Sequence, residues 1–147
     1  MGFKVNFEII FIKGESMSLF KNFIGNFKKS DVLDLANGFK LEYEANNLEN
    51  MKSIVDKFVD FHPDSYFASC SMVIYIIQLY KKDPLKVSPN MLNNLSIMER
   101  NIKFYDSSST DSLDNEELEL RQWFKKEVYE NVKYMESAGL RFSADDK

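Results

Sequence analysis

The chain has 147 residues, of which 44% are apolar and 14% aromatic, and its 23 acidic and 19 basic residues give a net charge of −4. A chain of this length and composition can bury roughly 70% of the surface that its unfolded state exposes, which excludes a disordered protein. The acidic balance argues against general affinity for nucleic acid or anionic lipid, and it is compatible with a basic protein partner.

Cysteine and histidine are almost absent, with one residue of each. A single Cys excludes an intramolecular disulfide and a cysteine metal cluster, and it fits a reducing cytoplasm. The densest apolar run, residues 66–80, is shorter than the ~18–20 apolar residues that cross a bilayer. We therefore expect a cytoplasmic protein that does not insert into membranes, binds no nucleic acid and holds no metal or cofactor.

The first 45 residues contain two similar alternating stretches. In residues 3–11 the apolar side chains fall on every second residue, and residues 38–45 repeat the pattern. Alternation of this kind predicts strands, so a small two-stranded β-ribbon near the N-terminus is one expectation. The expectation that we favour is that residues 1–16 are a translated leader. Residues 13–16 can be encoded by a purine-rich run that resembles a bacterial ribosome-binding site just before the codon of Met17.

Beyond residue 16, helical spacing of apolar residues predominates. It begins with an amphipathic segment directly after Met17. We predict a mainly α fold, an irregular bundle of about five helices that forms a single domain over residues 17–142. Residues 143–147 are predicted to be a flexible tail.

Two helices are predicted between residues 30 and 62. Ser30 or Asp31 can cap a short helix that runs through residue 36 and stops at Asn37-Gly38. Asn47 can cap the second helix, which His62-Pro63 ends. The apolar stripe of this second helix comprises Leu48, Met51, Ile54, Val55, Phe58 and Val59.

The third predicted helix is the most apolar part of the chain. Pro63 is placed as its first residue, where the missing amide hydrogen has no partner in any helix. From there to Lys82 the residues are apolar on almost every side, which predicts the central helix of a bundle. The β-branched residues between Val73 and Ile77 keep a buried strand as the alternative. Pro84 stops this element in either case.

The last two predicted helices have clear start signals. Ser88-Pro89 combines a capping residue with a proline at the first helical position. A polar loop over residues 106–112 follows. Asp114 can cap the last helix by accepting a hydrogen bond from the amide of Glu117, and Gly139 can end that helix after about Ser137.

The triplet His62-Pro63-Asp64 resembles the signature loop of J-domain co-chaperones, in which it joins two helices and stimulates the ATPase of an Hsp70 chaperone. Here the triplet also lies between two predicted helices. The preceding helix, however, carries Asp56 and Asp60 among its lysines, whereas the J-domain helix presents a basic face. We favour the interpretation of a helix end, with His62 at the negative end of the helix dipole.

No combination of residues in the sequence predicts catalysis. Cys70 lies inside the most apolar helix, and a thiol buried there is an inert core residue. Carboxylate pairs such as Glu116/Glu117 are adjacent in sequence and do not face each other on a helix. The five glycines form no phosphate-binding loop. We therefore expect that the protein is not an enzyme.

The strongest charge asymmetry lies between Phe104 and Leu120, which enclose six acidic residues and no Lys or Arg. A solvated helix start is one interpretation, because acidic residues stabilise helix N-termini. The other interpretation is a recognition patch for a basic protein, in which aromatic residues give contact area and carboxylates steer association. The candidate partner-binding residues are Tyr105, Asp106, Asp111, Asp114, Glu116, Glu117, Glu119 and Trp123.

Two segments, "SPNMLNN" (88–94) and "LDNEELELRQWFKKEV" (113–128), resemble parts of colicin-type immunity proteins. Acidic side chains of that family occupy the basic substrate site of a toxin, so the resemblance implies the same role for residues 106–119. We therefore expect a small, acidic, bacterial inhibitor of a basic effector, of the immunity or antitoxin type. The alternatives are a secretion chaperone or adaptor, and a J-like co-chaperone that acts through His62-Pro63-Asp64.

Overall fold

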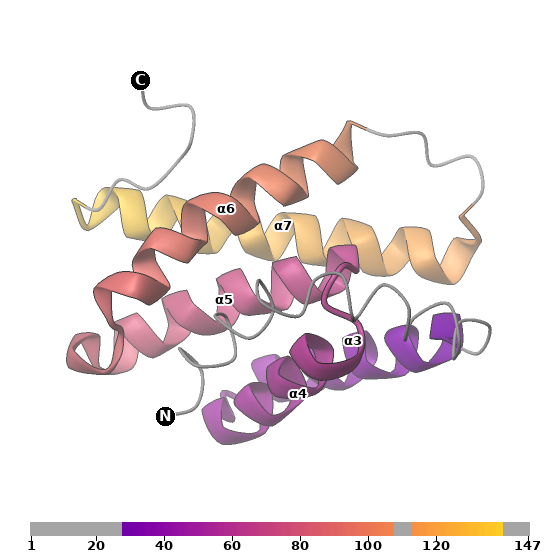
Figure 1. Ribbon diagram of the computed structural model, residues 1–147, viewed down its shortest axis with the longest axis horizontal. Coiled ribbons are helices and arrows are strands. Elements are labelled where there is room, and N and C mark those ends of the chain that lie inside the picture. The colour runs from indigo at the N-terminus through magenta and orange to yellow at the C-terminus, as the bar shows by residue number, and fades with distance from the viewer. Residues whose placement is uncertain (1–27, 108–112, 140–147) are drawn as a thin grey trace. The chain divides into compact units, whose positions relative to one another are not determined.

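The computed structural model describes residues 28–107 and 113–139. In these ranges the chain forms five α-helices and one short 3-10 helix, and no strand (Figure 1). The mainly α fold with about five helices is therefore confirmed for this part of the chain. The leader or strand expected in residues 1–16 and the tail expected in residues 143–147 lie outside the described residues.

The chain divides into two compact units, with the boundary between Ala68 and Ser69. The first unit contains α3 (Lys28–Glu44) and α4 (Leu48–Phe61). Helix α5 (Tyr66–Lys82) crosses the boundary in its first turn. The second unit also contains the 3-10 helix η2 (Pro84–Lys86), α6 (Pro89–Asp106) and α7 (Asn115–Ser137). The single domain expected over residues 17–142 stays a prediction.

The prediction of a short helix followed by a strand between residues 30 and 45 is wrong. Helix α3 runs without interruption through Asn37 and Gly38. The Asn37 side chain bonds within the helix, where its Nδ2 donates to the carbonyl oxygen of Leu33 at 3.0 Å. Phe39 and Tyr43, which the alternation placed on one face of a strand, stack one helical turn apart with ring centroids 6.3 Å apart. The second strand of the expected ribbon is therefore helical.

Helices α3 and α4 pack as a hairpin whose turn is built from two asparagines. Asn46 adopts a left-handed backbone with φ of 58°, which Asn tolerates better than most residues. Asn47 caps α4 as predicted, because its side chain accepts a hydrogen bond from the amide of Asn50 at 3.0 Å. The buried apolar side chains of these two helices are Leu33, Ala36, Phe39, Met51, Val55, Phe58 and Val59.

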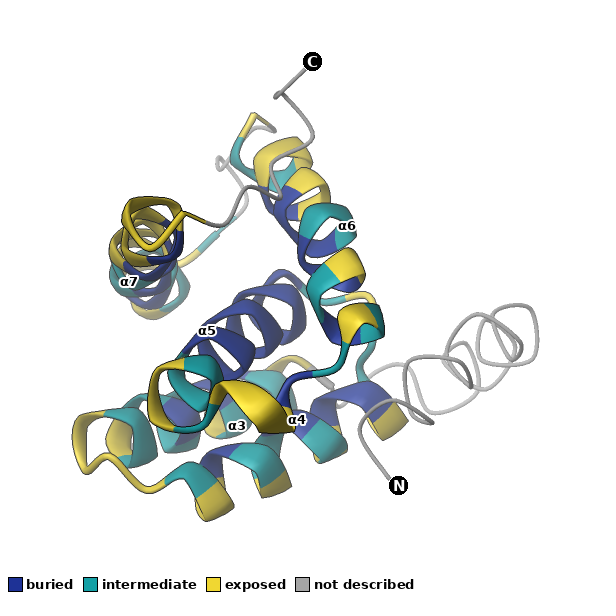
Figure 2. Ribbon diagram, turned by 90° about the vertical axis from the view of Figure 1, so that its left-hand side faces the viewer, coloured by how far each residue is buried: buried dark blue, intermediate teal, exposed yellow. Residues whose placement is uncertain are grey.

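Helix α5 is buried on every side over most of its length, and the alternative of a strand over Val73–Ile77 is wrong. All residues from Tyr66 to Ile77 are buried, and Figure 2 shows the buried colour continuing round α5. Full exposure begins only in the last turn, at Lys81 and Lys82. The sequence predicted this all-round burial, because a helix without a polar face cannot lie on a surface.

Helix α5 begins at Tyr66 and not, as predicted, at Pro63. The intervening residues form a turn in which the amide of Ser65 donates to the carbonyl oxygen of His62 at 3.2 Å. Ser65 then caps the helix, since its Oγ accepts a hydrogen bond from the amide of Ala68 at 3.0 Å. A serine cap two residues after the proline therefore sets the helix start, in place of proline at the first helical position.

The remaining helices begin as predicted, and α6 extends to Asp106, the first residue of the loop predicted over residues 106–112. Ser88 Oγ accepts from the amide of Met91 at 3.1 Å, with Pro89 as the first residue of α6. Asp114 Oδ1 accepts from the amide of Glu117 at 2.9 Å and caps α7. Beyond Ser137, Gly139 adopts the left-handed φ of 94° that ends many helices. The buried apolar residues of α6 and α7 are Met91, Leu95, Met98, Ile102, Leu120, Phe124, Val128, Val132 and Met135.

Polar and cation–π contacts join α5 to α7 within the second unit. The Nε2 of Gln78 donates to Oδ1 of Asn131 at 2.7 Å, and Asn131 is itself buried. One turn further along both helices, Nζ of Lys81 lies 4.8 Å from the ring centroid of Tyr134. The two helices therefore run side by side in the same direction (Figure 1).

Candidate protein-binding surface

The acidic residues of the predicted patch lie at the end of α6 and over the first turns of α7. Asp106 is the last residue of α6 and is half-buried. Asp111 lies outside the described residues. The acidic residues at the start of α7 are the half-buried Glu117 and the exposed Asp114, Glu116 and Glu119. These carboxylates also stabilise α7 itself, because a helix N-terminus carries a partial positive charge.

Helical spacing distributes the acidic residues of α7 over two faces. Residues three or four apart are neighbours on a helix, so Asp114, Glu117 and Arg121 follow one another along one face. By the same rule the two other acidic residues share a different face with Trp123. The predicted residues therefore do not form one flat patch. They form a ridge along the start of α7 that is acidic on two sides.

A cation–π contact brings the end of α6 to the start of α7. The guanidinium carbon of Arg121 lies 5.9 Å from the ring centroid of Tyr105. Tyr105 is half-buried, so it combines a structural role with some accessible surface. Because Arg121 follows Glu117 by one helical turn, this contact brings Tyr105 to the side of α7 that carries Glu117.

The side chain of Trp123 is half-buried, so only part of it is accessible to a partner. Its ring packs edge-to-face on Phe124, with ring centroids 4.9 Å apart and an interplanar angle of 86°. Phe124 is fully buried, so the contact holds the half-buried indole against the core of the second unit. Aromatic pairs of this geometry are favourable by about 0.5–1.5 kcal/mol beyond the area that they bury.

Phe104 is a further exposed aromatic residue at the end of α6, and it was not among the predicted site residues. Its side chain is 69% exposed, and its ring lies edge-on to the ring of Tyr105 with centroids 6.0 Å apart. The available signal was its position outside the helical stripe of α6, since the buried Ile102 is two residues away and therefore on another face. An apolar residue off the stripe is expected to face solvent.

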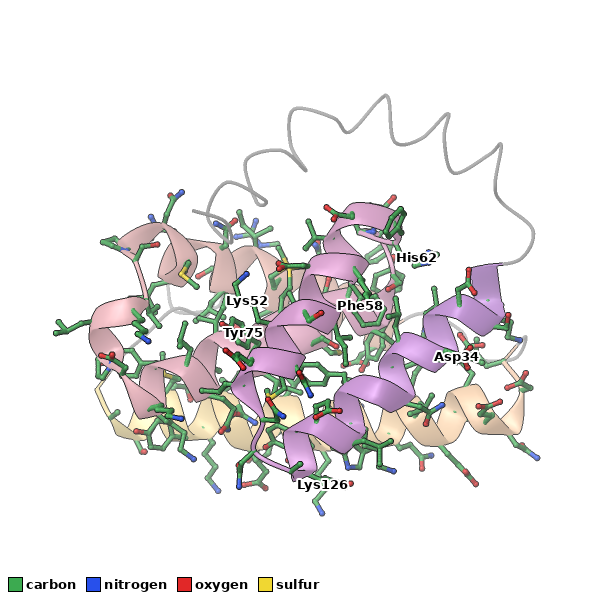
Figure 3. The ribbon with its side chains drawn as sticks, turned by 90° about the horizontal axis from the view of Figure 1, so that it is seen from below. Asp34, Lys52, Phe58, His62, Tyr75 and Lys126 are labelled. Atoms are coloured by element: carbon green, nitrogen blue, oxygen red, sulfur yellow. The ribbon has the colours of Figure 1, made fainter. Side chains whose placement is uncertain are left out.

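Cys70 and His62, the two other residues considered as functional sites, have structural roles. Cys70 is fully buried in α5, as predicted for a core thiol. His62 follows the last residue of α4, and its amide donates to the carbonyl oxygen of Phe58 at 2.8 Å, which is the geometry of a helix end (Figure 3). Among the described residues, no three His, Cys, Asp or Glu side chains gather closely enough to hold a metal ion.

No helix in residues 28–107 or 113–139 is both long enough and apolar enough to span a bilayer. Comparisons of the chain with protein-family models, with curated proteins and with solved structures give no match.

Proposed function

We propose that the protein is a small, non-enzymatic, cytoplasmic binding protein that inhibits a basic effector protein, in the manner of immunity proteins and antitoxins. The observation that supports this proposal is the acidic ridge at the start of α7, which the Arg121–Tyr105 contact connects to the aromatic end of α6. An acidic surface attracts a basic partner over a distance, and aromatic side chains supply contact area once the two proteins meet.

The two alternatives have less support. A secretion chaperone needs an exposed apolar groove, and the large exposed apolar side chains of the described residues are instead spread over five elements. They are Leu41 on α3, Phe61 on α4, Leu85 on η2, Phe104 on α6, and Tyr129 and Tyr134 on α7. A J-like co-chaperone would act through His62, and helix termination already accounts for the turn around that residue.

The proposal is tested first with the product of the neighbouring gene, because a toxin and its inhibitor act as a pair. Expression of that product alone should arrest growth, and its expression together with this protein should restore growth. The two proteins should also elute together from a size-exclusion column. A neighbouring product that is harmless, or that forms no complex with the protein, would contradict the proposal.

The role of the acidic ridge is tested by association kinetics on that complex. The triple variant Asp114→Asn, Glu116→Gln and Glu119→Gln removes three exposed charges while keeping side-chain shape. At ~0.01 M salt the Debye length is about 30 Å, so association should slow by about tenfold or more. The wild-type association rate should itself fall as salt is added.

A matched control shows whether slower association depends on where the removed charges lie or only on how many are removed. The variant Glu49→Gln, Glu130→Gln and Glu136→Gln also removes three exposed charges, but none of them belongs to the ridge. Its association rate should stay close to that of the wild type. If the two triple variants associate equally fast, the acidic residues of α7 are only a solvated helix start.

A further inference from the structure

A hydrogen bond between two polar side chains crosses the otherwise apolar contact of α5 with α7. Nε2 of Gln78 donates to Oδ1 of Asn131 at 2.7 Å, and Asn131 is only 4% exposed. Nδ2 of Asn131 donates to the carbonyl oxygen of Glu127 at 2.7 Å, one turn earlier in the same helix. The buried amide of Asn131 therefore has partners for its oxygen and its nitrogen, and the partner of the oxygen comes from α5.

The apolar side chains of the two helices do not by themselves determine how far α7 is shifted along α5. From Tyr66 to Ile77, α5 is buried and apolar except for Ser69 and Ser71. The buried apolar residues of α7 recur every three or four residues, at Leu120, Phe124, Val128, Val132 and Met135. If α7 moved by one turn, each of these side chains would take the place of its neighbour, and apolar surface would still meet apolar surface.

The connection between the helices does not determine the register either. A short loop between two consecutive antiparallel helices limits how far they can shift against each other. Helices α5 and α7 are instead parallel, and residues 83–114, which include α6, lie between them in the sequence. The position of α7 along α5 therefore depends on side-chain contacts.

The polar pair distinguishes one register from its neighbours. A shift by one turn moves α7 by about 5.4 Å, which is too far for the hydrogen bond. Oδ1 of Asn131 would then lie against apolar residues of α5, and an unpaired buried acceptor is costly. Single polar residues in the apolar seams of coiled coils select the register in the same way.

We propose that the hydrogen bond between Gln78 and Asn131 sets the register of α7 against α5. Without this bond, α7 would also occupy positions displaced by one turn. Such a displacement would carry the guanidinium of Arg121 away from the ring of Tyr105, which now lies 5.9 Å from it. The pair therefore also determines which residues of α7 lie beside the end of α6, whether or not the protein acts as an inhibitor.

The register can be measured as a distance between two spin labels by electron paramagnetic resonance. The labels are attached to Lys82→Cys and Gln122→Cys, both at exposed positions, in a Cys70→Ala background. Position 122 lies nine residues before Asn131 and position 82 lies four residues after Gln78. At 1.5 Å per residue the labels are therefore about 20 Å apart along the helix axes. With both amides present, the measurement should give one distance.

The test variant combines Gln78→Met with Asn131→Leu, which replaces both amides by apolar side chains of similar shape. Replacement of both partners leaves no unpaired polar atom of the pair, so the variant should stay folded. It should give a second distance that differs from the first by up to about 5 Å, the rise of one helical turn.

Asn94→Leu is the matched control. Asn94 is a buried amide of α6, 7% exposed, and its Nδ2 donates to the carbonyl oxygen of Asn90 in the same helix at 2.8 Å. This substitution removes a buried amide but no hydrogen bond between helices. The labelled control should therefore keep the single distance.

Three outcomes would overturn the role of the pair in setting the register. One is a single, unchanged distance in the variant with Met and Leu. Another is a second distance in the Asn94→Leu control, because the effect would then follow from the loss of any buried amide. The third is loss of the helical circular dichroism of the variant with Met and Leu, which would show that the pair is required for folding itself.

Discussion

At the scale of single residues, Gly38 and Gly139 differ in backbone conformation, because Gly38 is helical and Gly139 has a positive φ. Gly38 lies in the middle of α3 with helical geometry, and a Cβ built there would lie 3.5 Å from Cδ1 of Ile54, an ordinary van der Waals contact. Gly38→Ala should therefore stabilise the protein by about 0.5–1 kcal/mol, since Gly in a helix interior is less favourable than Ala by that amount. Thermal denaturation should show a higher midpoint.

Gly139 provides the control with the same substitution. Its φ of 94° is strained for any residue with a Cβ, and nothing lies within 4 Å of the position that a Cβ would occupy. Gly139→Ala should therefore destabilise the protein by about 1–2 kcal/mol through the backbone alone. A lower midpoint for Gly38→Ala would show that α3 and α4 pack too closely to admit a methyl group.

Predictions for single residues succeeded where the deciding contacts are local. The caps Asn47, Ser88 and Asp114 each bond an amide three residues later, so a few neighbouring residues determine them. The exposure of Phe104 was not predicted, for the opposite reason. Its exposure depends on which face of α6 the rest of the second unit covers, and that is decided by residues distant in sequence.

At the scale of elements, α3 shows how a short periodic pattern can mislead. Alternation over residues 38–45 fits a strand, but the same segment also continues the helical spacing of the buried residues Leu33, Ala36 and Phe39. In the observed helix the side chain of Leu41 is 66% exposed, so the helical arrangement leaves one large apolar side chain in contact with water. Asn37-Gly38 did not stop α3, because neither residue there adopts a left-handed backbone.

Helix α5 should not tolerate a charged side chain within its buried length. Ile77 is fully buried, so Ile77→Asp places an unpaired charge where water cannot solvate it. We expect a loss of more than about 4 kcal/mol, enough to unfold most proteins of this size. Circular dichroism should show loss of the folded helical signal at ambient temperature.

Leu85 is the matched position for the same chemical change. It is 96% exposed on η2, so Leu85→Asp should alter the free energy of unfolding by no more than about 0.5 kcal/mol. A soluble Ile77→Asp variant with the unfolding midpoint of the wild type would show that α5 is not an essential part of the core.

At the scale of the whole molecule, we predict that the two compact units unfold together. The sequence predicts one domain over residues 17–142, and the boundary between the units falls inside α5, two residues before Cys70. Cys70 is fully buried in a helix that is itself buried on every side. Its thiol can therefore react with a reagent only when α5 opens, and its labelling rate reports that opening.

We expect the free energy of opening from Cys70 labelling in increasing urea to equal the free energy of unfolding from circular dichroism, with the same dependence on urea. This equality is the signature of one cooperative transition, because the urea dependence scales with the surface exposed. The control is Ser53→Cys in a Cys70→Ala background, where the exposed thiol on α4 should react at once without urea. A smaller urea dependence for Cys70 labelling would mean that α5 opens while other helices stay folded, and the two units would then be separate folding domains.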